Sequence, residues 1–417
     1  MASQLEGSLA VARTVARCRP QVVCAYPITP QTHIVEALSR LVGSGELAPC
    51  EFVNVESEFA AMSVAIGASA TGARAYTATA SQGLLFMAEA LFNASGLGLP
   101  IVMTVANRAI GAPINIWNDH SDAMALRDCG WLQLYATSSQ EAADMHVQAF
   151  RLAERCSLPV MVCMDGFVLT HAFEPLEVPD AAAVDSYLPP FQPRQVLDPL
   201  DPVTIGAMVG PEAFTEVRYL AHAKQLEALD EIPALAQEFE AGFGRASGGL
   251  LSGYRCEGAD TIVVALGSVL GTLEEVVDER REQGAAIGAV AIKSFRPFPS
   301  AELRAALSGG RRVVVLERAF SVGVGGIVSG DVHAALSGLG LPLHTVVAGL
   351  GGRAITRRSL HAMLDELDGD RLGELHFLEL DREVVERELT RGRDHARPGP
   401  HAENILRELG VVGAGPV

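Results

Sequence analysis

The chain has 417 residues, of which 49% are hydrophobic, so it can bury sizeable cores in two or three domains. Its 41 glycines and only 6% aromatic residues are typical of an α/β protein with closely packed helices and sheets. A formal net charge of -18 without a dense Lys/Arg cluster excludes nucleic acids and anionic membranes as expected partners. No segment reaches ~18 apolar residues and the amino terminus lacks the features of a secretory signal, so we expect a cytoplasmic protein.

Seven cysteines are scattered along the chain, and no two of them form a CxxC pair. The chain therefore shows no motif for an iron-sulfur cluster or a structural zinc ion of its own. We expect reduced and mostly buried thiols.

Strand-like and helix-like segments alternate in the first part of the chain. Apolar runs rich in strand-forming residues occur at 21–26, 73–80, 99–106 and 158–165. Helix-like stretches lie between them at 33–43, 57–70, 82–95 and 139–156. This alternation predicts βαβ units and a parallel sheet covered on both faces, in a first domain that spans residues 1–185.

Later segments predict a connection and a second α/β domain. Residues 186–200 are dense in proline, so we place a connecting segment over 186–255, with two helices interrupted near Pro233. Alternating signals predict the second domain over 256–380, with one strand over 286–299. The charged tail, 381–417, is expected to be an arm or short helices that pack on a partner.

The segment AYPITPQT (25–32) follows an apolar strand and holds two prolines. Pro27 and Pro30 keep Tyr26 and Thr29 out of the helical region, so the loop is stiff. Open α/β sheets bind ligands at the carboxyl ends of their strands, which makes Thr29 a candidate for contacting a substrate. The alternative is that Thr29 caps a helix starting near His33.

Two acidic residues open the next helix, in ESEFAAMSVAIG (56–67). After Glu58 the helix is mainly apolar, so this carboxylate is expected to point into apolar surroundings. There it can transfer a proton or bond the nitrogen of a heteroaromatic ring. The alternative role for Glu56 and Glu58 is to stabilise the helix dipole.

Polar residues also follow the next two strands. Ser81 and Gln82 open a helix in TASQGL (79–84), where they can face a ligand or, for Ser81, cap the helix. Arg108 follows the strand at 99–106, and its planar guanidinium is suited to binding a carboxylate.

The segment NDHSD (118–122) matches no established metal spacing and is expected to be a surface loop making domain or subunit contacts. Glycine-rich segments at 321–330 and 349–352 lack a complete dinucleotide fingerprint, so they predict close packing or a subunit interface.

Taken together, AYPITPQT, ESEFAA, TASQGL, NRAIGAPINIWNDHSD, DGF (165–167), KSFRPFP (293–299) and GLGGR (349–353) resemble the alpha subunit of 2-oxoacid:ferredoxin oxidoreductases, in particular the pyruvate type. The resemblance implies a thiamine diphosphate-binding fold of the pyrimidine type, followed by a transketolase carboxyl-terminal-like α/β domain. By position, Glu58 resembles the glutamate that bonds the aminopyrimidine ring nitrogen, and Thr29 and Arg108 resemble the residues that hold the substrate carboxylate. Tyr26, Pro27, Ser81 and Gln82 are the further cofactor contacts that it implies.

The resemblance also implies an activity and partners. The family converts a 2-oxoacid and coenzyme A to acyl-CoA and carbon dioxide while reducing ferredoxin. This chain lacks a GDG motif followed by Asn, so a beta subunit is expected to supply the magnesium and diphosphate site. Gamma and delta subunits with iron-sulfur clusters are expected to carry electrons to ferredoxin.

Two other interpretations stay open. One is the beta-type component of a lipoamide-linked 2-oxoacid dehydrogenase complex, and YPITP and NDHSD argue against it. The other is a non-catalytic scaffold subunit, which the presence of Thr29, Glu58 and Arg108 disfavours. The identity of the 2-oxoacid is not predicted, although Ile110 and Ile114 are expected to line its pocket.

Overall fold

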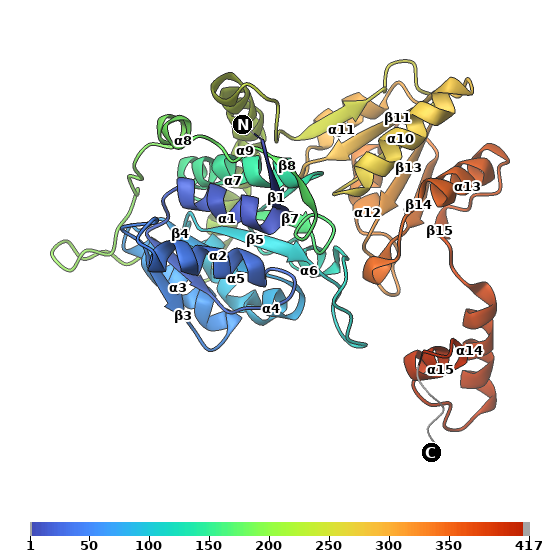
Figure 1. The fold of residues 1–417 in the computed structure, drawn as a ribbon, viewed down its shortest axis with the longest axis horizontal. Helices are drawn as coiled ribbons and strands as arrows, with labels where there is room; N and C mark the ends of the chain where they lie inside the picture. Colours follow the sequence, from blue (N-terminus) through green and yellow to red (C-terminus); the bar gives the residue numbers. More distant parts are fainter. Residues whose placement is uncertain (1, 412–417) are drawn as a thin grey trace.

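The computed structural model describes residues 2–411, and its first part forms a seven-stranded sheet in the order β12-β6-β7-β5-β4-β2-β3 (Figure 1). Six of these strands run parallel to their neighbours: β2 (Val22–Ala25), β3 (Glu51–Asn54), β4 (Ala75–Thr79), β5 (Val102–Asn107), β6 (Leu132–Tyr135) and β7 (Val160–Asp165). All residues of β4, β5, β6 and β7 are buried, as in a sheet covered on both faces. The predicted parallel α/β sheet is confirmed.

Helices cover both faces of this sheet. The helices are α1 (Gly7–Arg17), α2 (Thr32–Gly43), α3 (Glu58–Ala70), α4 (Ser81–Phe86), α5 (Ala88–Gly96), α6 (Ser121–Ala125), α7 (Ser139–Cys156) and α8 (Ala181–Tyr187). One core joins the sheet to α1, α2 and α7, and a second core joins it to α3, α4 and α5. A small antiparallel pair of β1 (Ser3–Glu6) and β8 (Phe173–Leu176) lies beside them. The helix predicted over 82–95 is divided at Met87 into α4 and α5.

The connecting segment holds one long helix, α9 (Phe214–Phe243), with Pro233 inside it. The prediction of two helices was therefore wrong. Pro233 cannot donate a backbone hydrogen bond, but the buried side chains of Ala228, Ile232, Leu235 and Phe239 pack into the first core on both sides of it. Tertiary packing keeps the helix continuous across the proline.

A second sheet has six strands in the order β15-β14-β13-β10-β11-β9. Its strands are β9 (Leu251–Tyr254), β10 (Thr261–Ala265), β11 (Ile287–Ile292), β13 (Arg312–Glu317), β14 (Leu343–Val347) and β15 (Leu375–Phe377). Only β9 runs antiparallel to its neighbour within this described sheet. The other elements of this unit are α10 (Val269–Glu282), α11 (Ser300–Leu307), α12 (Val328–Ala335), the short η1 (Leu350–Gly352) and α13 (Arg357–Asp368).

The predicted single strand over 286–299 is divided between the two sheets. After β11 the chain leaves the second sheet, and β12 (Ser294–Arg296) pairs antiparallel with β6 at the edge of the first. The Lys293 ammonium, between them, lies 2.6 Å from the Glu141 carboxylate of α7. This ion pair and the β12 pairing join the second unit to the first.

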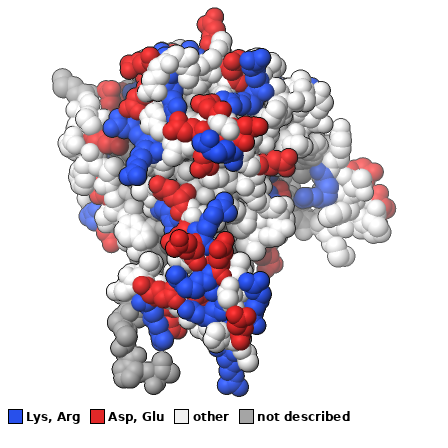
Figure 2. Space-filling view, turned by 90° about the vertical axis from the view of Figure 1, so that its right-hand side faces the viewer, with Lys and Arg blue, Asp and Glu red and all other residues white. Residues whose placement is uncertain are grey.

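Two helices near the carboxyl terminus, α14 (Arg382–Asp394) and α15 (His401–Glu408), stand apart from both sheets (Figure 1). The buried Glu388 carboxylate of α14 contacts His401 and Asn404 of α15, and Arg391 of α14 forms an ion pair with Glu408 of α15. Acidic and basic side chains alternate over this side of the molecule, without a continuous basic patch on the face shown (Figure 2). Among the described residues, no helix has both the length and the apolar character needed to cross a membrane.

Candidate active site

The carboxyl ends of four parallel strands bring the predicted site segments to one edge of the first sheet. The loop with Thr29 follows β2, Ser81 follows β4, Arg108 follows β5, and Asp165 ends β7. Parallel strands present their carboxyl ends at the same edge, which is where open α/β sheets bind ligands. The segments are therefore neighbours although they are distant in sequence.

Asp122 joins two of these segments. Its carboxylate is fully buried and accepts hydrogen bonds from the backbone N–H groups of Ser81 (2.9 Å) and Arg108 (3.0 Å). It also accepts bonds from Asn107 Nδ2 (2.9 Å) and the N–H of Ala123 (2.8 Å). Burial raises the pKa of Asp122 to about 6, although these four hydrogen bonds oppose the rise. This role of Asp122 was not predicted from the sequence, because it depends on a contact with a residue 41 positions away.

Arg108 is only 6% exposed, and its guanidinium contacts backbone carbonyl groups. Nη1 donates to the oxygen of Thr29 (3.0 Å), and Nε donates to the oxygen of Asn115 (3.1 Å). Burial lowers the pKa of Arg108, and Asp122 opposes that change. Within residues 2–411 the guanidinium has no ion-pair partner and Nη2 makes no hydrogen bond. A buried cation with free donors is suited to binding a ligand carboxylate.

Thr29 is exposed and contributes its backbone carbonyl to Arg108. The alternative role as a helix cap was wrong, because α2 begins at Thr32 with Gln31 in the capping position. Tyr26 and Pro27 are exposed beside it, and the Tyr26 carbonyl accepts a bond from Gln31 Nε2 (2.9 Å). The AYPITPQT loop is thus anchored by Gln31 on one side and Arg108 on the other.

Glu58 is the first residue of α3 and is 8% exposed. Its carboxylate lies against Gly83 of α4, where a Cβ atom would come within 2.5 Å of Oε1 and 2.6 Å of Thr79 Oγ1. No described residue donates a hydrogen bond to the Glu58 carboxylate. Thr79 Oγ1 is buried and has no hydrogen-bond partner among the described residues. Glu58 and Thr79 thus offer two unpaired polar groups at the turn between β4 and α4.

Ser81 and Gln82 lie at this same turn. Ser81 is fully buried with φ of 49°, a left-handed conformation that a residue with a side chain adopts at a cost. Its hydroxyl contacts the carbonyl oxygen of Ala109 and the side-chain oxygen of Gln82. Ala80 occupies the helix-capping position and no side chain caps α4, so the capping role considered for Ser81 was wrong.

The NDHSD segment is buried, so the prediction of a surface loop was wrong, whereas its predicted domain contacts are present. Asp119 Oδ2 accepts a bond from the N–H of Gly351 (2.9 Å), and His120 Nε2 lies 2.6 Å from Asp165 Oδ1. Asp165 also accepts a bond from the N–H of Ser268 (3.0 Å) and lies 3.5 Å from Arg318. The contacts of Asp119 with Gly351, and of Asp165 with Ser268 and Arg318, join the first unit to the second.

The charge state of Asp165 follows from these contacts. Burial acts to raise its pKa, but His120 and Arg318 together with the hydrogen bond from Ser268 hold the pKa well below its usual range. The side chain is therefore a buried carboxylate anion shared by the two units.

Large apolar side chains surround the site and face solvent. Ile114 is 74% exposed and Trp117 is 52% exposed on the loop after Arg108. Phe59 at the start of α3 and Phe86 at the end of α4 are also exposed, and the centroids of their rings are 6.4 Å apart. An exposed apolar surface of this kind is typical of a contact with another protein.

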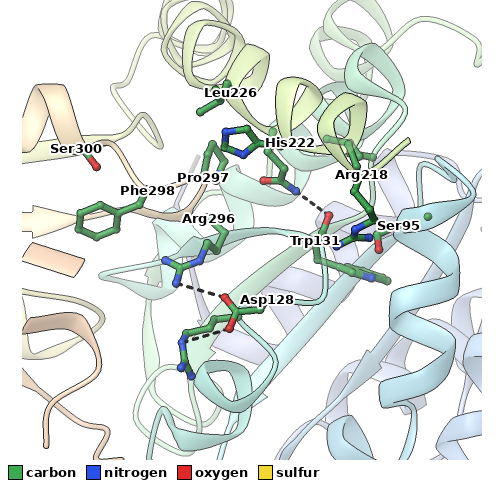
Figure 3. Close-up of a pocket in the computed structure, with 16 residues that line it drawn as sticks. Ser95, Asp128, Trp131, Arg218, His222, Leu226, Arg296, Pro297, Phe298 and Ser300 are labelled. Carbon is green, nitrogen blue, oxygen red and sulfur yellow. Dashed lines mark hydrogen bonds and ion pairs between the residues drawn. The ribbon is translucent and has the colours of Figure 1, made fainter. Parts of the chain in front are cut away.

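A cavity of about 460 Å³ lies at the opposite edge of the first sheet (Figure 3). Its walls include Trp131 before β6, Arg296 of β12 and His222 of α9. Arg296 and Asp128 form an ion pair of 3.8 Å at its margin. Because Trp131 precedes its strand whereas Arg108 follows one, this cavity is separate from the candidate active site.

Comparisons with known proteins agree with the two units. Residues 13–238 match the thiamine diphosphate-binding domain of pyruvate flavodoxin/ferredoxin oxidoreductases, and residues 259–360 match core domain II of pyruvate:ferredoxin oxidoreductases. A solved structure, 2-oxoglutarate:ferredoxin oxidoreductase from Magnetococcus marinus, has a similar fold with a TM-score of 0.66 at 20% identity. The match covers 88% of this chain and 65% of that one.

Curated relatives are similar over most of their length. The chain is 50% identical to pyruvate synthase subunit PorA of Methanosarcina barkeri over 87% of this chain and 91% of the relative. It is 38% identical to ketoisovalerate oxidoreductase subunit VorA of Pyrococcus horikoshii over 87% of this chain and 93% of the relative. The resemblance predicted from the motifs is confirmed: the chain belongs to the pyruvate flavodoxin/ferredoxin oxidoreductase family.

Proposed function

We propose that this chain is the alpha subunit of a thiamine diphosphate-dependent pyruvate:ferredoxin oxidoreductase, and that Glu58 and Arg108 are its two central site residues. The observation that carries the proposal is that Glu58 and Arg108 are both buried without an ion-pair partner in the described chain. The Glu58 carboxylate lies against Gly83 in the first turn of α4, and Asp122 ties the backbone of Ser81 in that turn to the backbone of Arg108. Unpaired buried charges are costly, so they are typical of sites that a ligand completes.

The site residues fit the pyrimidine half of thiamine diphosphate. Glu58 is proposed to accept a hydrogen bond from a ring nitrogen, since its carboxylate is buried and has no donor within residues 2–411. Gly83, Ser81 and Gln82 are proposed to border the ring, with Tyr26 and Pro27 at its entrance. When bound, the cofactor supplies the carbon nucleophile and stabilises the charge left by decarboxylation.

Arg108 and Thr29 are proposed to orient the 2-oxoacid. Arg108 would bind the substrate carboxylate through its free Nη2 group, while its bonds to the carbonyls of Thr29 and Asn115 fix the plane of the guanidinium. Because the carboxylate leaves as carbon dioxide, the main contribution of Arg108 is orientation of the keto group. The half-buried Ile110 and exposed Ile114 are proposed to line the substrate pocket.

A partner is proposed to complete the site. The chain lacks the GDG and Asn pattern that holds magnesium and diphosphate, and the exposed Phe59, Phe86, Ile114 and Trp117 offer an apolar surface around the site. We assign the diphosphate and magnesium site to a beta subunit, and the iron-sulfur clusters to gamma and delta subunits, in a cytoplasmic complex. In this chain, residues 1–185 would hold the cofactor and 256–380 would form the second domain, with 186–255 between them and 381–417 as an arm.

The experiment replaces Arg108 by Ala in the purified complex and measures pyruvate-dependent reduction of ferredoxin or a low-potential dye. Removing one partner of a buried charged contact costs about 2–5 kcal/mol, so KM for pyruvate should rise by roughly 30-fold to several thousand-fold. Arg127→Ala is the control, because Arg127 lies by the cavity at the opposite edge of the sheet. A KM within about 2-fold of the wild-type value would remove Arg108 from the substrate site.

The substrate is tested in parallel with a panel of 2-oxoacids. We expect the highest kcat/KM with pyruvate, in line with the 50% identity to a pyruvate synthase subunit against 38% to a ketoisovalerate oxidoreductase subunit. A higher kcat/KM with a branched 2-oxoacid would instead assign the chain to that substrate.

A further inference from the structure

Three side chains with no role in the proposed reaction meet at the start of α2. Glu6 ends β1, His33 lies in the first turn of α2, and His171 lies in the turn that follows β7. His33 Nδ1 is 2.6 Å from Glu6 Oε1, and the centroids of the two imidazole rings are 4.7 Å apart. One possible ligand atom from each of the three residues lies within 4.8 Å of the other two.

We propose that Glu6, His33 and His171 form a binding site for one divalent transition-metal ion, with Zn²⁺ as its best match. Two imidazoles and one carboxylate are a ligand set that Zn²⁺ favours, and they leave a fourth position for water or for a group from a partner. Ligands of a tetrahedral Zn²⁺ lie roughly 3.3 Å apart, given Zn–N bonds of about 2.0 Å. The three ligand atoms lie within 4.8 Å of one another, so movements of the side chains alone would bring them to this spacing.

The surroundings of His171 prepare it to be a ligand. Its Nδ1 lies 2.7 Å from the hydroxyl oxygen of buried Thr170, which also accepts a bond from the N–H of Phe167 (2.8 Å). An Nδ1–H bond to this oxygen leaves Nε2 free, as in the outer contacts of most metal-binding histidines.

The site is accessible and its position suggests what a bound ion would do. The His33 side chain is 49% exposed, while Glu6 and His171 are half-buried. An ion held by all three would fasten β1 and the turn after β7 to the first turn of α2. That turn directly follows the AYPITPQT loop, so the ion would stabilise this loop from its far end.

The test measures Zn²⁺ binding to the full-length chain, without a histidine tag, by competition with a chromophoric chelator. We expect one Zn²⁺ per chain, and a d–d absorption spectrum of tetrahedral type when Co²⁺ is used instead. His33→Gln and His171→Gln should each weaken Zn²⁺ binding by at least about 100-fold, and Thr170→Val by roughly 10–100-fold, the usual effect of losing an outer contact. Zn²⁺ should raise the unfolding temperature of the wild type but not of the two histidine variants.

His222→Gln is the matched control, since His222 is an exposed histidine on α9 and should leave Zn²⁺ binding unchanged. Unfolding temperatures in the presence of a chelator show whether each variant is folded. The proposal is overturned if the wild type binds no stoichiometric Zn²⁺, or if folded His33→Gln and His171→Gln variants bind it as tightly as the wild type. Since binding is measured without turnover, either result is independent of the proposed enzymatic function.

Discussion

At the scale of single residues, the site is built from buried polar groups whose partners come from distant segments. The Asp122 carboxylate fixes the backbone of Ser81 and Arg108, and the carbonyl of Thr29 fixes the Arg108 guanidinium. Thr29, Glu58, Ser81 and Arg108 could be predicted from the sequence because each follows an apolar strand or opens a helix. Asp122 could not be selected in this way, because its importance depends on which donors the fold brings to it.

Buried His146 provides a pH test at the same scale. Its Nδ1 donates to the carbonyl of Ala142 (2.6 Å), its Nε2 contacts the hydroxyl of Thr104, and burial lowers its pKa from 6.5 to about 4. The unfolded chain therefore binds a proton between pH 6.5 and 4 that the native chain does not. This contribution to stability is complete above pH 6.5 and is lost as the pH falls toward 4.

The measurement compares the free energy of unfolding of the wild type and His146→Gln in denaturant at several pH values. The difference between wild type and variant should decrease by about 3 kcal/mol from pH 7 to pH 4, since one pKa unit corresponds to about 1.4 kcal/mol. A difference that does not change with pH would mean that His146 titrates alike in both states.

At the scale of elements, the structure confirms the long apolar strands and departs from the predictions where elements are short or depend on distant partners. The strands β4, β5 and β7 are continuous buried runs, and such runs can be recognised from the local sequence alone. In contrast, β3 and β6 have four residues each and were not predicted. The separation of β11 from β12 depends on pairing with β6, which local sequence does not encode.

A substitution at Gly83 of α4 tests whether the packing of α4 against α3 positions the Glu58 carboxylate. A Cβ atom there would lie 2.5 Å from Glu58 Oε1, so Gly83→Ala should displace the Glu58 carboxylate and reduce turnover of the complex by at least about 10-fold. Gly67→Ala in α3 is the matched control, because a Cβ atom at Gly67 meets no heavy atom within 4 Å. That variant should keep full turnover and gain roughly 0.5–1 kcal/mol of stability. Equal turnover in both variants would show that Glu58 does not depend on the space beside Gly83.

At the scale of the whole molecule, the two α/β units are joined by strand pairing and by buried contacts. The strand β12 extends the first sheet. Asp165 of the first unit accepts a hydrogen bond from the N–H of Ser268 and lies 3.5 Å from Arg318, both in the second unit. The sequence predicted domain or subunit contacts for the NDHSD segment, but in a surface loop. Asp165 and Ser268 are 103 residues apart, so no local sequence pattern predicts their contact.

Asp165→Ala tests this connection. It leaves His120 and Arg318 buried without their shared carboxylate, which should cost about 3–5 kcal/mol of unfolding free energy. We expect thermal unfolding by calorimetry to separate into two transitions, one for each unit. Glu36→Ala, which removes only the exposed i,i+4 pair with Arg40, should change the stability by less than about 0.5 kcal/mol. A single transition at the wild-type temperature for Asp165→Ala would contradict a structural role for this contact.

The most direct test of the proposed function is turnover of the purified complex after Glu58→Gln. A glutamine keeps the size of the side chain but removes its charge and proton-transfer capacity, so kcat should fall by roughly 10²- to 10⁴-fold while KM for pyruvate changes little. Glu56→Gln is the control, since Glu56 is exposed two residues earlier in the same turn and should retain full activity. A Glu58→Gln complex with kcat within about 3-fold of the wild-type value would contradict the central role assigned to this carboxylate.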